Sequence, residues 1–399
     1  MQKIPHFFSL KLTSNIKMDF TYLQPVEQEV LEEIASFKTQ KLGNNVNFHT
    51  EKAFPEINPS VKIAILTVSE DRNAINNKGT GTNFNTVRKE LYNLHKGNWS
   101  TDIIDLGTIK KGNSIKDTNF ALSETMYNLL KLNIIPIVLG GSQALTYAMY
   151  RAFDKLEQMI NLVAIDNKFD LEEMDAPLNS RNYLSKIIMN EPNNLFNYSN
   201  IGYQTFFNAQ DEIDLLDKLY FDSYRLGAVN KDLTIAEPVL RDADIVSTDL
   251  SAIRITEAPA NNNSSPNGFY GEEICTILRY AGLSDKVKTL GIFEYNHLLD
   301  NRKQTAQLIA QMIWYFIEGV NYRTNEYPFQ SKKNYLKYIV PIDEDVINFY
   351  KSNLSDRWWM EITNNITKKE TLIPCSYQDY LEANNQNIPE RWWKTLRKL

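Results

Sequence analysis

The sequence predicts an α/β fold in which a mostly parallel sheet is covered by helices on both faces, a three-layer α/β/α arrangement. Short apolar runs, typical of strands buried on both faces, recur from residue 61 onward. Stretches with apolar residues at helical spacing lie between these runs. Such alternation of strands and helices favours a parallel sheet between two helical layers. With 399 residues and 43% hydrophobic content, the chain suffices for one large core with appendages.

The individual elements follow from local patterns. Apolar runs predict the strands VKIAILTV, STDIIDLG, IIPIVLGG, INLVAID, YRLGAVN, ADIVSTDL and VKTLGIFEY. Helical periodicity predicts helices over residues 26–37, 85–95, 117–132, 142–156 and 305–318. The stretch 171–220 contains the polar string NEPNNLFNYSN, and we expect less regular structure there.

The chain divides into three predicted parts: an N-terminal arm with one helix (1–60), the α/β domain (61–319) and an aromatic-rich C-terminal extension (320–399). Two similar peptides of the extension hold four of the six tryptophans, which are Trp358, Trp359, Trp392 and Trp393. Aromatic residues beside arginine are frequent anchors of protein interfaces, so these four are candidate contacts for a protein partner. The alternative, which we favour, is that they fold back onto the body and bury apolar area.

Composition excludes several classes of protein. The formal charge of −6 comes from well-mixed acidic and basic residues, which argues against a nucleic-acid partner. No apolar stretch is long enough to span a membrane, and the N-terminus lacks the apolar core of a signal peptide. Cys275 and Cys375 lie far apart in the sequence and are expected to be free thiols. We expect a soluble, cytoplasmic protein.

Polar motifs follow four of the predicted strands. Ligands of open parallel sheets bind beyond the carboxyl ends of the strands, so these positions are the first candidates for a functional site. In chain order, the motifs are GGSQ ending at Gln143, DNKFD over 166–170, STDLS over 247–251, and EYN beginning at Glu294.

Together, these motifs resemble the GGDHS, DAHxD and SxDxD sequences and the final glutamate of the arginase (ureohydrolase) family, most closely its formimidoylglutamase-like members. Supporting matches extend the resemblance over about residues 61–319. The resemblance implies an arginase-like fold and a centre of two manganese ions held by two histidines and four aspartates. It also implies hydrolysis of a guanidino or formimino C–N bond. Relatives of this fold commonly self-associate, so a homo-oligomer is a further expectation.

Three of the six implied ligand positions carry other residue types. The aspartates that remain are Asp166, Asp170 and Asp249, while the replaced positions are Gln143 and Lys168 for the histidines and Ser251 for an aspartate. Manganese prefers imidazole and carboxylate ligands, and this set has no histidine left. We therefore expect no metal cofactor, with a single divalent metal as the alternative.

Lys168 is the most informative of these replacements. A protonated amine has no lone pair, so it cannot serve as a metal ligand. Placed among three aspartates, it can supply the positive charge that metal ions would otherwise supply, and we predict an internal salt-bridge cluster. The alternative is an exposed lysine on a loop, where an ion pair contributes little.

The leading hypothesis is a catalytically degenerate protein of this fold, a pseudoenzyme with a binding or scaffold role. No residue is assigned as catalytic with confidence; the vestigial candidates are Asp166, Asp170, Asp249 and Glu294. Glu294 is expected to line a polar pocket rather than to act as an acid. The first alternative is an active C–N hydrolase of a guanidino or formimino substrate with one metal or none. The second is a docking unit of a larger assembly.

Overall fold

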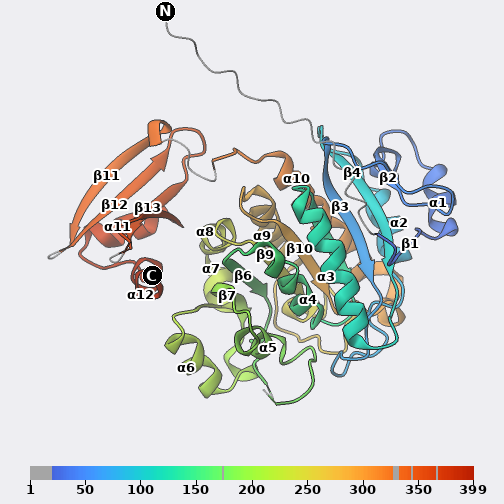
Figure 1. The fold of residues 1–399 in the computed structure, drawn as a ribbon, viewed down its shortest axis with the longest axis horizontal. Coiled ribbons are helices and arrows are strands. Elements are labelled where there is room, and N and C mark those ends of the chain that lie inside the picture. Colours follow the sequence, from blue (N-terminus) through green and yellow to red (C-terminus); the bar gives the residue numbers. More distant parts are fainter. Residues whose placement is uncertain (1–19, 173–174, 327–331, 343–344, 365–366) are drawn as a thin grey trace, which may run out of the picture.

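The computed structural model describes residues 20–172, 175–326, 332–342, 345–364 and 367–399. A ten-stranded sheet with helices on both sides forms the body (Figure 1). A four-stranded antiparallel sheet with two helices forms a separate unit at the C-terminal end of the chain. The three-layer α/β prediction is therefore confirmed, with the antiparallel sheet as its C-terminal extension.

The body sheet is parallel except at one edge, where β1 runs antiparallel to β4. Its strands, in spatial order, are β1 (Leu23–Gln24), β4 (Asp102–Ile109), β3 (Val61–Val68), β5 (Ile135–Gly140), β10 (Thr289–Phe293), β9 (Ile245–Asp249), β6 (Ile160–Ile165), β7 (Leu195–Tyr203) and β8 (Asp222–Arg225), with β2 (Val46–Phe48) also beside β4. Successive side chains of a strand point to opposite faces. In β3, accordingly, Ile63 and Ile65 pack on one side, and Ala64 and Leu66 pack on the other.

Helices cover the two faces as two groups with separate hydrophobic cores. One face carries α1 (Gln28–Ala35), α2 (Asn85–Tyr92), α7 (Leu226–Lys231), α8 (Ala236–Arg241), α9 (Gly271–Leu283) and α10 (Gln304–Asn321). The other face carries α3 (Ile115–Lys131), α4 (Leu145–Arg151), α5 (Tyr183–Met189) and α6 (Gln210–Lys218). Within the described residues, no helix combines the length and the apolarity needed to cross a bilayer. The compartment stays a prediction.

Two local predictions were wrong. The run YRLGAVN was predicted as one strand, but β8 ends at Arg225 and α7 begins at Leu226. Its apolar residues, Leu226 and Val229, are three positions apart and pack from a helix onto the core. The stretch 171–220 is also more regular than expected, because its asparagine-rich part forms the strand β7 between β6 and β8.

The extension has its own core between one sheet and two helices. Its elements are β11 (Tyr335–Ile342), β12 (Asp345–Ser352), β13 (Trp358–Thr363), β14 (Glu370–Cys375), α11 (Tyr377–Asn384) and α12 (Glu390–Lys398). Trp358 and Trp392 are buried in this core, and Trp359 is buried against the body. Trp393 remains 37% exposed. Three of the four tryptophans are thus enclosed by this chain, and a partner contact through Trp393 stays a prediction.

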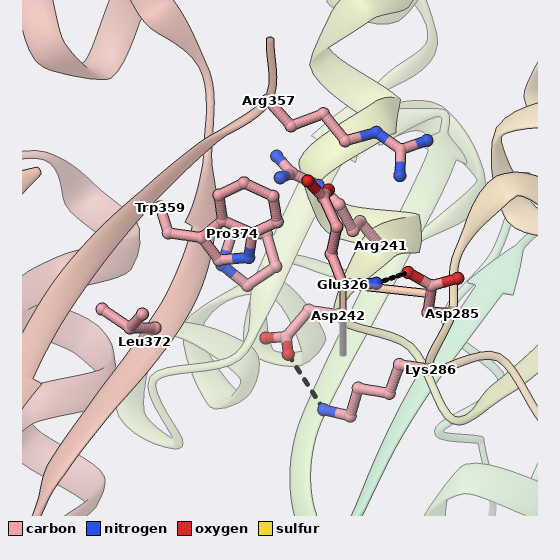
Figure 2. A pocket seen from close by; sticks show the side chains of 9 residues that line it. All are labelled: Arg241, Asp242, Asp285, Lys286, Glu326, Arg357, Trp359, Leu372 and Pro374. Atoms are coloured by element: carbon pink, nitrogen blue, oxygen red, sulfur yellow. Dashed lines mark hydrogen bonds and ion pairs between the residues drawn. The ribbon is translucent and has the colours of Figure 1, made fainter. Parts of the chain in front are cut away.

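The extension contacts the body at the edge where β9 and β10 begin. Figure 2 shows Trp359 and Pro374 of the extension facing Arg241 and Asp242 of the body. The Arg241 guanidinium lies 4.4 Å from the centroid of the Trp359 ring and donates to the Cys375 carbonyl at 2.9 Å. The polar motifs follow the carboxyl ends of β9 and β10. The extension therefore lies at the amino ends of these strands, on the side of the sheet away from the motifs.

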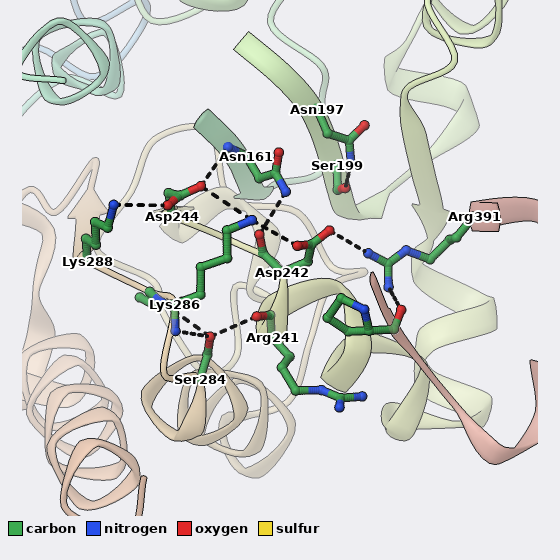
Figure 3. A network of polar contacts seen from close by, with 12 residues as sticks. Asn161, Asn197, Ser199, Arg241, Asp242, Asp244, Ser284, Lys286, Lys288 and Arg391 are labelled. Carbon is green, nitrogen blue, oxygen red and sulfur yellow. Dashed lines mark hydrogen bonds and ion pairs between the residues drawn. The ribbon is translucent and has the colours of Figure 1, made fainter. Parts of the chain in front are cut away.

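Asp242 is the ionic centre of this junction (Figure 3). It accepts from Lys286 at 2.9 Å and from Arg391 of the extension at 3.2 Å, and all three side chains are largely buried. We expect Asp242→Asn to lower the free energy of unfolding by about 2 kcal/mol, because Arg391 loses this ion pair and Lys286 keeps only the longer one with Asp244, at 3.6 Å. Urea unfolding measures it, with the exposed Asp217→Asn as control. Equal stability of the two variants would contradict this role.

Candidate active site at the carboxyl ends of four strands

The sheet order brings the four strand-end motifs together. β5, β10, β9 and β6 are consecutive neighbours in the body sheet, and all run parallel. Phe293 pairs with Asp249, and Ile165 pairs with Thr248, so these strands end at nearly the same level. Four carboxyl groups, those of Asp166, Asp170, Asp249 and Glu294, therefore gather beyond their ends, and each is at most 8% exposed.

Glu294 is fixed by donors from two other segments. Its Oε1 accepts the backbone N–H of Gln143 at 2.9 Å, and its Oε2 accepts the Asn77 amide at 2.7 Å. Burial, and next the charge of Asp249, raise its pKa well above the usual range. Both oxygens are engaged by the protein, so Glu294 ties the loop bearing Asn77 to the sheet.

Asp166 and Asp170 form a pair of facing carboxyl groups. Asp166 Oδ1 accepts the backbone N–H of Lys168 at 3.0 Å, but no N–H or O–H of the described chain reaches Oδ2 of either aspartate. Burial first, and then the charges of neighbouring carboxylates, raise the pKa of both side chains well above the usual range. Two buried carboxyl groups that raise each other's pKa titrate as a pair, and the loss of both protons is disfavoured.

Asp249 is the carboxyl group best suited to accept a proton near neutral pH. Its Oδ1 accepts the Ser251 backbone N–H at 2.6 Å and the Asn261 amide at 3.4 Å. Burial raises its pKa to about 6, a rise that the Ser251 donors and the charge of Lys168 limit. A base whose pKa lies close to the working pH is efficient in proton transfer.

The predicted salt-bridge cluster of Lys168 is wrong for the described part of the chain. Its ammonium forms no ion pair within 4.0 Å, and it lies 5.8 Å from the centroid of the Phe207 ring. The Lys168 N–H donates to Asp166, and its carbonyl accepts from Asn200 at 2.8 Å. A buried ion pair with the aspartates would carry a desolvation penalty, and the Lys168 side chain is only half-buried. Without this ion pair, burial raises the pKa of all three aspartates.

The backbone is strained at two residues of this site. Asp170 has φ 56° and Glu294 has φ 69°, in the left-handed region that residues with a Cβ seldom adopt. Such conformations cost of order 1–3 kcal/mol and persist where the surrounding structure holds them in place, often at active sites. Two of the four carboxyl groups thus owe their direction to a strained backbone.

Two glycines allow the loop over 69–81 to close over the strand ends. A Cβ on Gly141 would lie 2.1 Å from the Glu70 carbonyl oxygen, and a Cβ on Gly81 would lie 2.4 Å from Gly141 Cα. Only glycine permits this approach, which also explains why Asn77 reaches Glu294.

Several polar contacts of the site were not predicted. Gln143 donates to Ser247 at 3.0 Å, and Ser247 also contacts Thr146 at 2.6 Å. Gln143 Oε1 and the hydroxyl of Tyr183 are buried without a hydrogen-bond partner in the described chain. Tyr183 comes from α5, in the stretch expected to be irregular, and no sequence motif marks it. Asn77 lies on the loop over 69–81, and no pattern in the sequence predicts its contact with Glu294.

The donors do not fit the two-manganese centre that the resemblance implies. They are carboxyl, amide and hydroxyl oxygens, with Lys168 at one histidine position. Among the residues that the structure describes, no group of three or more histidine, cysteine, aspartate or glutamate side chains is arranged to hold a metal ion. The acid–base chemistry available here belongs to the carboxyl groups.

Sequence relatives of this chain are named as enzymes. Formimidoylglutamase of Staphylococcus haemolyticus is 24% identical over 296 residues, which cover 70% of this chain and 92% of that protein. Formimidoylglutamase of Bacillus subtilis is 23% identical over 282 residues, which cover 64% of this chain and 86% of that protein.

Solved structures share the fold of the body. Trypanosoma cruzi formiminoglutamase, solved with manganese, aligns with a TM-score of 0.62 at 16% identity, covering 66% of this chain and 95% of that chain. Formimidoylglutamase from Bacillus subtilis aligns with a TM-score of 0.61 at 18% identity, covering 66% and 88%. At these identities, the likeness establishes the arginase-like fold.

These findings contradict the hypothesis of a catalytically degenerate scaffold. The relatives match over most of their own length, and their names are those of hydrolytic enzymes. Replacements at Gln143, Lys168 and Ser251 therefore do not mark an inactive protein by themselves. The comparisons favour the hydrolase that stood as the alternative, and hydrolysis is the chemistry of the family.

A family match covers residues 61–318, from the first residue of β3 into α10. This span holds all four strand ends and more than half of the chain. It agrees with the resemblance seen in the motifs, which extends over about residues 61–319. The chain belongs to the arginase family.

Proposed function

We propose that this chain hydrolyses a C–N bond of a linear amidine, in the first place a formimidoyl compound, at the cluster of Asp166, Asp170 and Asp249. The observation that carries the proposal is a set of buried oxygens without donors: Asp166 Oδ2, Asp170 Oδ2 and Gln143 Oε1. Buried oxygens without hydrogen bonds destabilise the folded protein unless a ligand supplies the missing donors.

An amidinium ion has the complementary chemistry. It is a planar cation with several N–H donors, and paired N–H groups match the geometry of a carboxylate. No cationic side chain of the described chain lies within 4.0 Å of the three aspartates, so the positive charge that these groups lack would come from the substrate. The names of the relatives support a formimidoyl group in particular.

The carboxyl groups supply the proton transfers. Asp249, as base, takes a proton from water while the water oxygen bonds to the amidinium carbon. Because that carbon is already cationic, the tetrahedral intermediate is neutral and needs little oxyanion stabilisation. The proton shared by Asp166 and Asp170 passes to the leaving nitrogen as the C–N bond breaks. The hydroxyl proton of the intermediate returns to these two carboxyl groups, and the proton on Asp249 passes to the released amine. Formamide and an ammonium product result, and every carboxyl group regains its starting state.

A product assay on the full-length protein tests the proposal. N-formimidoyl-L-glutamate, agmatine and arginine are incubated in turn, and formamide and urea are followed by NMR. Metal content of the same sample is measured, and the assay is repeated after chelation and with added manganese. Formamide release from the formimidoyl substrate is expected. Release of neither product from any substrate, in any of these conditions, would overturn the proposal.

A further inference from the structure

A cavity of about 740 Å³ lies among three helices that cover one face of the body sheet. It is lined by residues within 114–120 of α3, within 147–151 of α4 and within 177–190, and we call it the helix-face cavity. α4 packs against both α3 and α5, so the three segments are neighbours. None of the four carboxyl groups at the strand ends lines this cavity. Its volume is within the range of about 300–1,000 Å³ that is usual for small-molecule sites.

Part of the lining is apolar. Phe120 of α3, Tyr147 of α4 and Leu178 contribute to it. Phe120 is 56% exposed, whereas Leu122 of the same helix is fully buried in the body core. An apolar ligand in the cavity would cover the ring of Phe120 and remove apolar area from water, which is favourable.

The charged residues that line the cavity are all cationic. They are Lys116, Arg151 and Lys186, and no aspartate or glutamate lines it among the described residues. Within the same part of the chain, Lys116 forms no ion pair within 4.0 Å. Arg151 pairs with Asp154 at 3.2 Å, on one side of its guanidinium. The lining therefore carries an excess of positive charge, which is complementary to an anion.

The guanidinium of Arg151 is held in place with one donor unused. Its Nη1 donates to the Pro192 carbonyl at 2.8 Å, and its Nη2 donates to the Asn190 carbonyl at 2.8 Å. It also lies over the ring of Tyr147, 5.1 Å from the centroid. Its Nε is buried and has no hydrogen-bond partner in the described chain. Buried donors are seldom left unsatisfied in native proteins, so this N–H indicates an acceptor from outside the chain.

We propose that the helix-face cavity binds a small carboxylate with an apolar body. The carboxylate accepts from the Nε–H of Arg151 and lies near the ammonium of Lys186, which precedes Asn190 by one helical turn. The apolar body lies along Phe120 and Leu178. A cationic amidine would be repelled by this lining, so the cavity is a second site with a ligand of opposite charge to the substrate proposed for the strand ends.

Isothermal titration calorimetry of the full-length protein with octanoate and with octan-1-ol tests the proposal. The two compounds have the same chain length, and only octanoate is anionic. We expect octanoate to bind at one site per chain, at least about tenfold more tightly than octan-1-ol, because only the anion gains a charge-assisted hydrogen bond. Lys186→Met should weaken octanoate binding about fivefold and leave octan-1-ol binding unchanged. Binding of neither compound, or equal binding of both, would overturn the proposal.

Phe120→Asp tests the position of the site. An acid in place of the apolar ring should weaken octanoate binding at least about tenfold, and the exposure of Phe120 keeps the cost to folding small. Phe206→Asp is the matched control, because Phe206 is 69% exposed and does not line the cavity. Unchanged binding in Phe120→Asp, or equal weakening in both variants, would contradict the assignment.

Light scattering and circular dichroism of both variants complete the test. We expect each variant to be folded and to keep the oligomeric state of the wild type. A change of oligomeric state in Phe120→Asp alone would assign this face to a second copy of the chain and would overturn the carboxylate site.

Discussion

Asp249→Asn is expected to lower kcat/KM for a formimidoyl substrate by about 10²–10⁴-fold, the usual contribution of a general base. The amide keeps the volume of the side chain and can still accept from the Ser251 N–H at its oxygen, so the local structure should persist. It cannot take a proton from water. Formamide release followed by NMR over pH 5–8 measures the loss, and the wild-type rate should fall as pH drops below about 6.

Two outcomes would contradict the assignment of Asp249. One is unchanged kcat/KM in the variant, and the other is a wild-type rate that is flat between pH 5 and 8. The exposed Asp217→Asn variant controls for the loss of one negative charge. Because Asp217 lies on α6, away from the strand ends, its rate should equal that of the wild type.

Asp170→Asn is expected to raise the free energy of unfolding at pH 8 by about 2 kcal/mol or more, and to leave it nearly unchanged at pH 4. Burial raises the pKa of Asp170 far above its unfolded value. Between those two values the folded state binds more protons than the unfolded state, so this carboxyl group costs stability increasingly as pH rises. An amide has no such cost, can donate to Asp166, and tolerates φ 56° well.

Urea unfolding of wild type and variant at several pH values measures this difference. The gain from Asp170→Asn should grow steadily from pH 4 to pH 8, whereas Asp217→Asn should show no trend. A variant that is less stable than wild type at pH 8 would mean that the charged form of Asp170 is stabilised in the fold. That result would also remove the shared proton from the mechanism.

The effects expected for Asp249→Asn and Asp170→Asn both reflect a trade-off between the activity of the site and the stability of the protein. The site gathers four buried carboxyl groups, and two of them sit on a strained backbone. Each feature costs stability in the protein alone, and neither is needed for the sheet or its helices. Such costs are commonly retained where a site needs them for activity.

Elements with strong local signals were predictable. β3, β5 and β6 are continuous apolar runs, and the helices of the body carry apolar residues at helical spacing. Prediction failed where the local signal was ambiguous. The run over 224–230 is short and apolar, so periodicity did not separate the end of β8 from α7. β7 is rich in asparagine, a residue that is rare in strands. It forms a strand because it pairs with β6 on one side and with β8 on the other.

The same limit applies to the candidate site. Motifs at the strand ends located Asp166, Asp170, Asp249 and Glu294 correctly as neighbours, because parallel strands end at one edge of a sheet. The partners of these groups were not predictable. Asn77 and Tyr183 belong to segments that are distant in sequence from these motifs, and no sequence pattern predicts where their side chains lie.

By itself, the sequence determined the class of fold, the strand ends that carry the candidate site and the family, because strands, helices and the motifs that follow them are local patterns along the chain. Only the tertiary structure decided whether Lys168 would form ion pairs with the aspartates. The outcome depends on the direction of the Lys168 side chain, which the backbone sets, and on the desolvation cost of its ammonium, which the surrounding residues set. Neither is a property of the residues alone.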